Sequence, residues 1–159
     1  MSYRLGVRSR LELMGVHPHL VAVVHRAIAS TDQDFRVVDG VRTDDEQALL
    51  VAAGASRTLN SKHLRQADGY GHAVDLVPVI NGVPRWEWPL IYPVARAMHQ
   101  SATERNLPLV WGGVWDRSFL DLLAPALEIE VENYVARMRA RGRRRVLIDG
   151  PHYQLGVPA

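Results

Sequence analysis

The 159-residue sequence contains no cysteine. A disulfide framework, a thiolate metal site and a cysteine nucleophile are therefore excluded, and any metal site must use histidines and carboxylates. No stretch approaches the ~20 consecutive apolar residues that a membrane-spanning helix needs. The apolar run Leu20–Val24 is interrupted by His25 and Arg26 before it reaches the length of a secretory signal core. We therefore expect a chain that is made in the cytoplasm, with no signal peptide and no transmembrane segment.

Neither sign of charge predominates, because 19 Lys and Arg are balanced by 17 Asp and Glu, for a formal net charge of +2. This small surplus fits an anionic partner such as cell wall, lipid headgroups or nucleic acid, but selects none of them. The hydrophobic content of 47% is typical of a folded globular protein. Since no repeat or low-complexity tract divides the chain, we expect one domain over residues 1–159.

Hydrophobic spacing and end signals predict the secondary structure. Helices are expected over Pro18–Ala29, from the capping box Thr43–Glu46 to Gly54, over Pro89–Ala102 and over Leu127–Met138. Strands are expected over Phe35–Val41, His72–Ile80, Val83–Trp86, Leu107–Trp111 and Val146–Leu155, with a tight turn at Asn81-Gly82. Because helices and strands mix without regular βαβ units, the predicted fold is α+β with a small, mostly antiparallel sheet and flanking helices.

Two segments carry side chains suited to metal chemistry. His63, His72 and Asp75 lie close together in the sequence, and Asp149 precedes His152 by three positions. Catalytic zinc typically takes three nitrogen or oxygen ligands, and a nearby unbound carboxylate can accept a proton from water. From spacing alone, however, polar residues at turns and strand ends remain the simpler interpretation.

The pattern Ser61-x-His63 followed by Gly71-x-Ala73-x-Asp75 resembles the signature of a known peptidase family. That family includes D-Ala–D-Ala dipeptidases, D,D-carboxypeptidases and phage L-alanyl-D-glutamate endolysins. Further blocks resemble its phage branch: Arg10-Leu11, Val16–Leu20, Asp34–Val37, Gly40–Thr43 with Gln47, Trp111–Trp115 and Pro151–Leu155. The resemblance extends over most of the chain and implies the small α+β fold shared by D,D-peptidases and the Hedgehog signalling domain.

The resemblance also implies a role for each matching residue. The positions that match the zinc ligands are His63, Asp75 and His152. Asp149 matches the acidic residue that activates water, and Arg42 matches an arginine that binds substrate and stabilises the carbonyl oxygen as it becomes negative. Ser61 is expected to shape the ligand loop or to touch substrate.

The sequence departs from the family pattern in two places. The stretch from His63 to Asp75 is longer than the pattern, so extra residues within Arg65–Tyr70 must form a loop, which could lie over the substrate cleft. The extra length makes His72 an alternative ligand, but we prefer His63 because Ser61 precedes it as the pattern requires. The stretch Leu120–Arg145 is also longer than expected and contains a helix with a basic end.

The resemblance implies a zinc-dependent endolysin that cleaves the L-Ala–D-Glu bond of peptidoglycan stem peptides, acting in the periplasm or cell wall. A D-Ala–D-Ala carboxypeptidase or dipeptidase of wall maintenance stays open, as does a non-catalytic zinc domain that binds wall or protein. Another divalent metal in the same ligands also stays open. The basic run Arg137–Arg145 is either a solvated helix end or a contact for anionic envelope material. We expect a monomer with no nucleic-acid partner, since no reading motif accompanies these charges.

Overall fold

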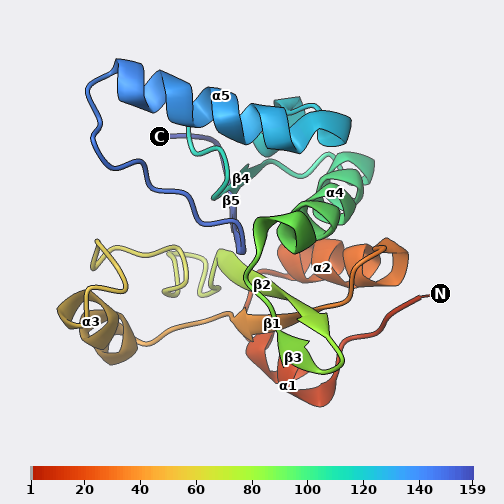
Figure 1. The fold of residues 1–159 in the computed structure, drawn as a ribbon. Coiled ribbons are helices and arrows are strands. Elements are labelled where there is room, and N and C mark those ends of the chain that lie inside the picture. The colour runs from red at the N-terminus through yellow and green to blue at the C-terminus, as the bar shows by residue number, and fades with distance from the viewer. Residues whose placement is uncertain (1) are drawn as a thin grey trace.

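The computed structural model describes residues 2–159 and contains a small antiparallel sheet flanked by helices (Figure 1). The strand order is β1-β2-β5-β4, and β3 also pairs with β2. The strands are β1 (Phe35–Asp39), β2 (Ala73–Ile80), β3 (Val83–Pro84), β4 (Leu109–Trp111) and β5 (His152–Leu155). The helices are α1 (Val7–Glu12), α2 (Pro18–Ser30), α3 (Asp44–Ala52), α4 (Trp88–Glu104) and α5 (Leu127–Ala140), with short 3-10 turns η1 (Phe119–Asp121) and η2 (Ala124–Ala126). The predicted α+β class is confirmed.

One face of the sheet forms the hydrophobic core with the helices. Val24 of α2 and Met98 of α4 are fully buried in the same cluster as Val74 and Leu76 of β2 and Tyr153 of β5. Burial of this apolar surface is the main contribution that holds the helices to the sheet. None of the helices within residues 2–159 is both long enough and apolar enough to cross a bilayer.

The opposite face of the sheet carries polar side chains. Successive side chains of a strand point to opposite faces, so the residues between the core-facing positions must point away from the core. Asp75 lies between Val74 and Leu76, and His152 precedes Tyr153. Asp75 and His152 are direct partners in the β2–β5 ladder, so this register places the two side chains beside each other.

Two local signals form as the sequence predicts. The Thr43 hydroxyl accepts a hydrogen bond from the Glu46 amide at 3.1 Å, and the Glu46 carboxylate accepts one from the Thr43 amide at 3.1 Å. Asn81 and Gly82 both adopt positive φ, 51° and 78°, as the tight turn between β2 and β3 requires. The observed α2, α4 and α5 also start within a residue or two of the predicted helix starts.

The predicted strand over Val146–Leu155 is too long, because β5 begins only at His152. The Asp149 amide donates to the Gly112 carbonyl at 2.7 Å, and the Gly112 amide donates to the His152 carbonyl at 2.9 Å. Asp149 and His152 therefore both bond to the backbone of Gly112, and Gly150 and Pro151 form a turn between them. This turn lets Asp149 leave the line of the strand while it stays next to β5.

Candidate metal centre and active site

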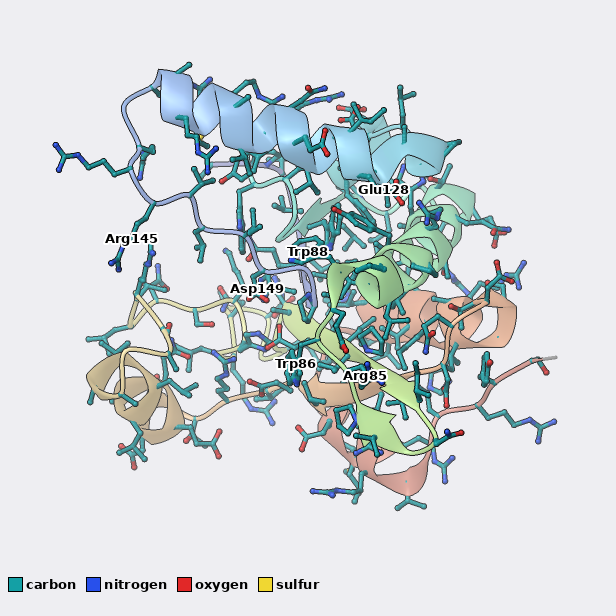
Figure 2. The ribbon with its side chains drawn as sticks, viewed as in Figure 1. Arg85, Trp86, Trp88, Glu128, Arg145 and Asp149 are labelled. Atoms are coloured by element: carbon teal, nitrogen blue, oxygen red, sulfur yellow. The ribbon has the colours of Figure 1, made fainter. Side chains whose placement is uncertain are left out.

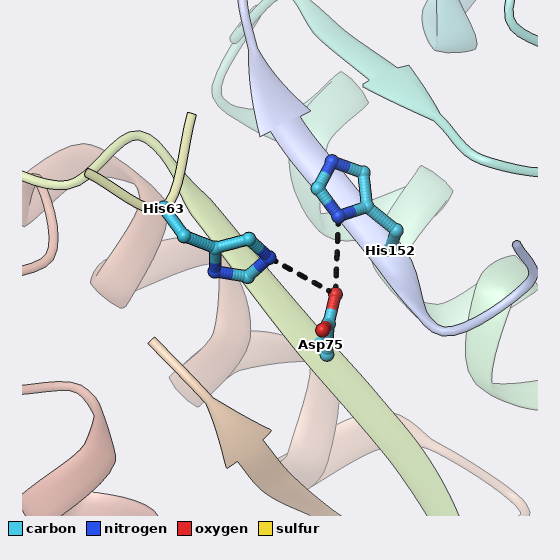
Figure 3. Close-up of side chains that lie close together, drawn as sticks. All are labelled: His63, Asp75 and His152. Atoms are coloured by element: carbon cyan, nitrogen blue, oxygen red, sulfur yellow. Dashed lines mark hydrogen bonds and ion pairs between the residues drawn. The ribbon is translucent and has the colours of Figure 1, made fainter. Parts of the chain in front are cut away.

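His63, Asp75 and His152 converge on the polar face of the sheet (Figure 3). The Oδ1 atom of Asp75 lies 3.3 Å from His63 Nε2 and 3.1 Å from His152 Nδ1. Each residue offers one ligand atom, and these atoms lie within 4.8 Å of one another. Within residues 2–159 this is the one group of three or more His, Asp or Glu side chains close enough to hold a metal ion.

The outer ring nitrogens of both histidines are already engaged. His63 Nδ1 lies 2.7 Å from the Gly40 carbonyl oxygen, and His152 Nε2 lies 2.9 Å from Gln154 Oε1. An oxygen of this kind only accepts, so each of these nitrogens carries the proton and donates it. In the neutral rings, His63 Nε2 and His152 Nδ1 are therefore acceptors that face the Asp75 carboxylate. Such bonds from the second nitrogen are how proteins orient histidine ligands.

Three acceptors that face one another fit a cation between them. His63 Nε2 is buried and has no hydrogen-bond partner, an arrangement that is costly unless a metal or a proton occupies the site. Without metal, burial raises the pKa of Asp75, but its close contacts with His152 and His63 outweigh that effect and hold its pKa below the usual range. Burial lowers the pKa of His152, but the bond to Asp75 outweighs this and raises it. A proton is thus the alternative occupant when no cation is bound.

The backbone before Arg42 fixes the position of His63. A Cβ atom on Gly40 would lie 1.9 Å from the Glu12 carbonyl oxygen, so only glycine fits where α1 ends against this segment. The Gly40 carbonyl is thereby held beside the His63 ring, and the Arg42 amide donates to the His63 carbonyl at 2.9 Å. Ser61 Oγ accepts from the His63 amide at 3.1 Å. Ser61 therefore shapes the turn that presents the ring.

His72 is not part of the convergent group. Its Nε2 lies 2.7 Å from Asp68 Oδ2, and its ring packs 5.6 Å from that of His17. The loop Arg65–Tyr70 folds as a tight turn, in which the Gln66 amide donates to the Tyr70 carbonyl at 2.9 Å. This loop is not among the residues that line the cavity at the three converging side chains. The segment 54–58 after α3 borders that cavity instead, together with Asn60, Ser61 and Lys62.

Arg42 reaches the same site from the loop between β1 and α3. Its Nε donates to Asp39 Oδ2 at 2.5 Å, its Nη1 donates to Gln47 Oε1 at 3.0 Å, and its Nη2 lies 3.5 Å from Asp75 Oδ2. Gln47 is 1% exposed and uses its amide nitrogen to bond Ser56 Oγ and the Thr58 carbonyl. Nη2 also lies 2.5 Å from Asp39 Oδ2, so Asp39 and Gln47 hold the guanidinium from two sides, with Nη2 next to Asp75.

Asp149 lies on the turn that precedes β5, near the centre of the molecule (Figure 2). Trp111 Nε1 donates to the Gly150 carbonyl at 2.7 Å, and a Cβ on Gly112 would lie 2.0 Å from the Asp149 carbonyl oxygen. This close contact holds the turn in place. Burial raises the pKa of the Asp149 carboxyl, and the negative charge of Asp75 raises it further.

A cavity of about 540 Å³ joins these residues. Its lining includes all six positions that the sequence singled out: Arg42, Ser61, His63, Asp75, Asp149 and His152. It also includes Trp115 and Gln154, which are not among those six. Trp115 stacks on the His152 ring with 5.2 Å between ring centroids. Strand alternation alone places Gln154 on the face of His152, so that signal was present in the sequence. The contact of Trp115 depends on tertiary packing.

Residues 1–122 match the family model described as phage L-alanyl-D-glutamate peptidase. The chain belongs to this family. It is 33% identical over 122 residues to the L-alanyl-D-glutamate peptidase of Escherichia phage T5, which covers 74% of this chain and 85% of that protein. It is also similar to the crystal structure of the Serratia marcescens L-Ala D-Glu endopeptidase ChiX, with a TM-score of 0.70 and 33% identity. That match covers 98% of this chain and 91% of the other, so it includes the segment with Asp149 and His152.

Part of the basic run Arg137–Arg145 is not free for a partner. Arg137 Nε and Nη2 donate to the two carboxylate oxygens of Asp116 at 2.9 and 2.7 Å. This bidentate pair fixes α5 to the loop after β4. The remaining arginines of the run form no ion pair with an acidic residue among the described part of the chain.

Proposed function

We propose that this family member is a zinc-dependent endolysin that hydrolyses the L-Ala–D-Glu bond of peptidoglycan stem peptides. The observation that carries the proposal is the convergence of His63 Nε2, Asp75 Oδ1 and His152 Nδ1 as three acceptors with no donor between them. The relatives from phage T5 and Serratia marcescens are named for this bond, which favours it over a terminal D-Ala bond.

The ligand set suits zinc, which in catalytic sites takes two histidines and a carboxylate and leaves a position for substrate or water. When bound, zinc would supply Lewis-acid chemistry, which polarises a carbonyl and makes water a stronger nucleophile at neutral pH. The protein supplies the fixed directions of the three ligand atoms. The bonds from the histidines to Gly40 and Gln154 provide that fixation.

Asp149 is proposed as the general base. Its carboxylate accepts a proton from the attacking water and returns it to the amine that leaves. A group with both tasks works best when its pKa lies nearer to the working pH. Burial moves the pKa of Asp149 in that direction.

Arg42 is proposed to stabilise the negative charge that develops on the scissile carbonyl oxygen. A donor fixed in advance contributes most to such stabilisation, because it need not reorganise during the reaction. The bonds to Asp39 and Gln47 provide that fixation and place Nη2 3.5 Å from the Asp75 carboxylate. Ser61 is proposed to act through the loop, since its hydroxyl is used by the His63 amide.

The test is mass spectrometry of fragments released from purified peptidoglycan, with and without a chelator. Release that stops with chelator and leaves new D-Glu amino termini is the expected result. Loss of terminal D-Ala alone would instead establish a carboxypeptidase. No release by folded, zinc-loaded protein would leave a binding domain as the function.

Asp149→Ala tests the assignment of the base. It should lower the cleavage rate by about 10²- to 10⁴-fold, the range typical of general bases, while zinc content stays unchanged. Asp68→Ala is the matched control, because this carboxylate lies outside the cavity and bonds His72. Hydrolysis by Asp149→Ala at the normal rate would assign the base elsewhere.

A further inference from the structure

A second cavity of about 370 Å³ adjoins the one at the metal ligands. The two share four lining residues: Arg57, Trp115, Leu147 and Gln154. A peptide bound with its scissile bond at His63, Asp75 and His152 can therefore extend from one cavity into the other without leaving the protein surface.

This second cavity is lined by four arginines, and we call it the arginine cavity. Arg57 comes from the segment after α3, whereas Arg141, Arg143 and Arg145 come from the end of α5 and the loop that follows. Figure 2 shows the loop with Arg145 lying over the segment that follows α3. Among residues 2–159, none of these four side chains forms an ion pair with a carboxylate.

One acidic side chain, that of Asp116, also lines the arginine cavity. It does not neutralise the four arginines, because both its oxygens are bonded by Arg137. The hydrogen bond from Arg137 holds the pKa of Asp116 below its usual range, so this pair persists at neutral pH. The lining therefore holds four guanidinium groups and one carboxylate side chain that is already paired, together with the last residue of the sequence, Ala159.

Trp115 belongs to the wall between the two cavities. The indole Nε1 of Trp115 is buried and has no hydrogen-bond partner in the described structure. Val110, Tyr134 and Met138 add apolar surface to the lining, and the four arginine side chains are exposed.

We propose that the arginine cavity is a subsite for free carboxylates on the D-Glu side of the scissile bond. Glutamate has two carboxyl groups, and when one continues the peptide chain the other stays free and anionic. On the alanine side, the carboxyl is part of the scissile amide and the amine is acylated, so that side offers no charge. Guanidinium groups bind carboxylates with two parallel hydrogen bonds. This subsite rests on the proposed L-Ala–D-Glu specificity.

The test uses the full-length, zinc-loaded protein and two soluble peptides. Both are N-acyl-L-Ala-γ-D-Glu-L-Lys, one with the free α-carboxylate on glutamate and one with that group as the amide. We expect kcat/KM to be about tenfold or more higher for the carboxylate peptide, the size of one charge-assisted hydrogen bond. Arg57→Gln, Arg143→Gln and Arg145→Gln should each reduce this preference by lowering kcat/KM for the carboxylate peptide only.

Arg139→Gln and Arg144→Gln are the matched controls, because these arginines belong to the same basic run but do not line the cavity. They should leave both peptides unaffected. If the cavity variants lose kcat/KM equally on the two peptides, the subsite is overturned. It is also overturned if these variants lose activity on intact wall but not on the soluble peptides. If the wild-type protein releases fragments from wall at another bond and cleaves neither peptide, the proposed bond specificity itself fails.

Discussion

The position of Gln47 allows a quantitative prediction about Arg42. Gln47 lies on α3, is 1% exposed, and joins Arg42 to the segment that borders the cavity. Its replacement by leucine keeps a similar volume but removes bonds to Arg42 Nη1, Ser56 Oγ and the Thr58 carbonyl. With about 1 kcal/mol for each of the two neutral bonds and about 1.5–3 kcal/mol for the bond to the charged group, Gln47→Leu should lower the free energy of unfolding by about 3.5–5 kcal/mol.

A second substitution separates stability from the positioning of Arg42. Gln47→Glu keeps an oxygen for Arg42 Nη1 but replaces the donor amide with an acceptor that faces the Thr58 carbonyl. It should therefore also be destabilising, by about 2 kcal/mol or more, yet retain the guanidinium orientation. We expect Gln47→Leu to lower kcat by at least about tenfold and Gln47→Glu to retain more of it.

Urea unfolding measures the stability, and steady-state kinetics on a soluble stem peptide measures kcat and KM at a temperature where both variants are folded. Gln100→Leu is the control, since Gln100 is exposed on α4 and bonds only Glu104, and its effect should stay within about 0.5 kcal/mol. A folded Gln47→Leu protein with wild-type kcat would refute the inference that Gln47 positions Arg42.

Three further predictions follow from the site and its supports. His63→Ala should lose bound zinc, and zinc should no longer raise its melting temperature, whereas His72→Ala should retain both properties. Metal analysis and thermal unfolding measure them, and the reverse pattern would reassign the ligand. Gly112→Ala should reduce activity at least about tenfold, because the added Cβ would lie 2.0 Å from the carbonyl oxygen of Asp149 in the turn before β5. Unchanged peptide cleavage would show that this turn can move freely. A double-mutant cycle on Asp116 and Arg137 should give a coupling of about 0.5–1 kcal/mol. Because the pKa of this carboxyl is lowered in the folded state, that contribution should be present at neutral pH and should decline as the pH falls below about 4 and passes the lowered pKa. A coupling that does not decline on acidification contradicts the ion pair.

Much of the secondary structure follows from local signals in the sequence. The capping box at Thr43 and Glu46 forms with both hydrogen bonds, and the turn at Asn81-Gly82 adopts the positive φ angles that these residues tolerate. Such signals depend on neighbouring residues alone, so a sequence pattern contains them in full. The helix α1 was missed, because its six residues show too little periodicity and it is held partly by Ser9 Oγ, which accepts a bond from the Val37 amide.

The grouping of the candidate ligands depended on more than spacing. The motifs placed His63, Asp75 and His152 in one set only through the resemblance, and spacing alone left His72 as an alternative. The tertiary structure shows why His63 joins the group. Its ring is held by the Gly40 carbonyl from a segment 23 positions earlier in the chain, whereas His72 bonds Asp68 on the other side of the loop.

The sequence by itself determined the family, the α+β class, and the chemical types available for the site, since these depend on motif residues, periodicity and the lack of cysteine. Only the tertiary structure decided which side chains share a cavity. The antiparallel register sets Asp75 beside His152, the close approach of Gly112 turns Asp149 toward them, and the end of α5 meets the segment after α3 to collect the arginines. These contacts join residues far apart in the chain, and their geometry is fixed by packing of the whole core.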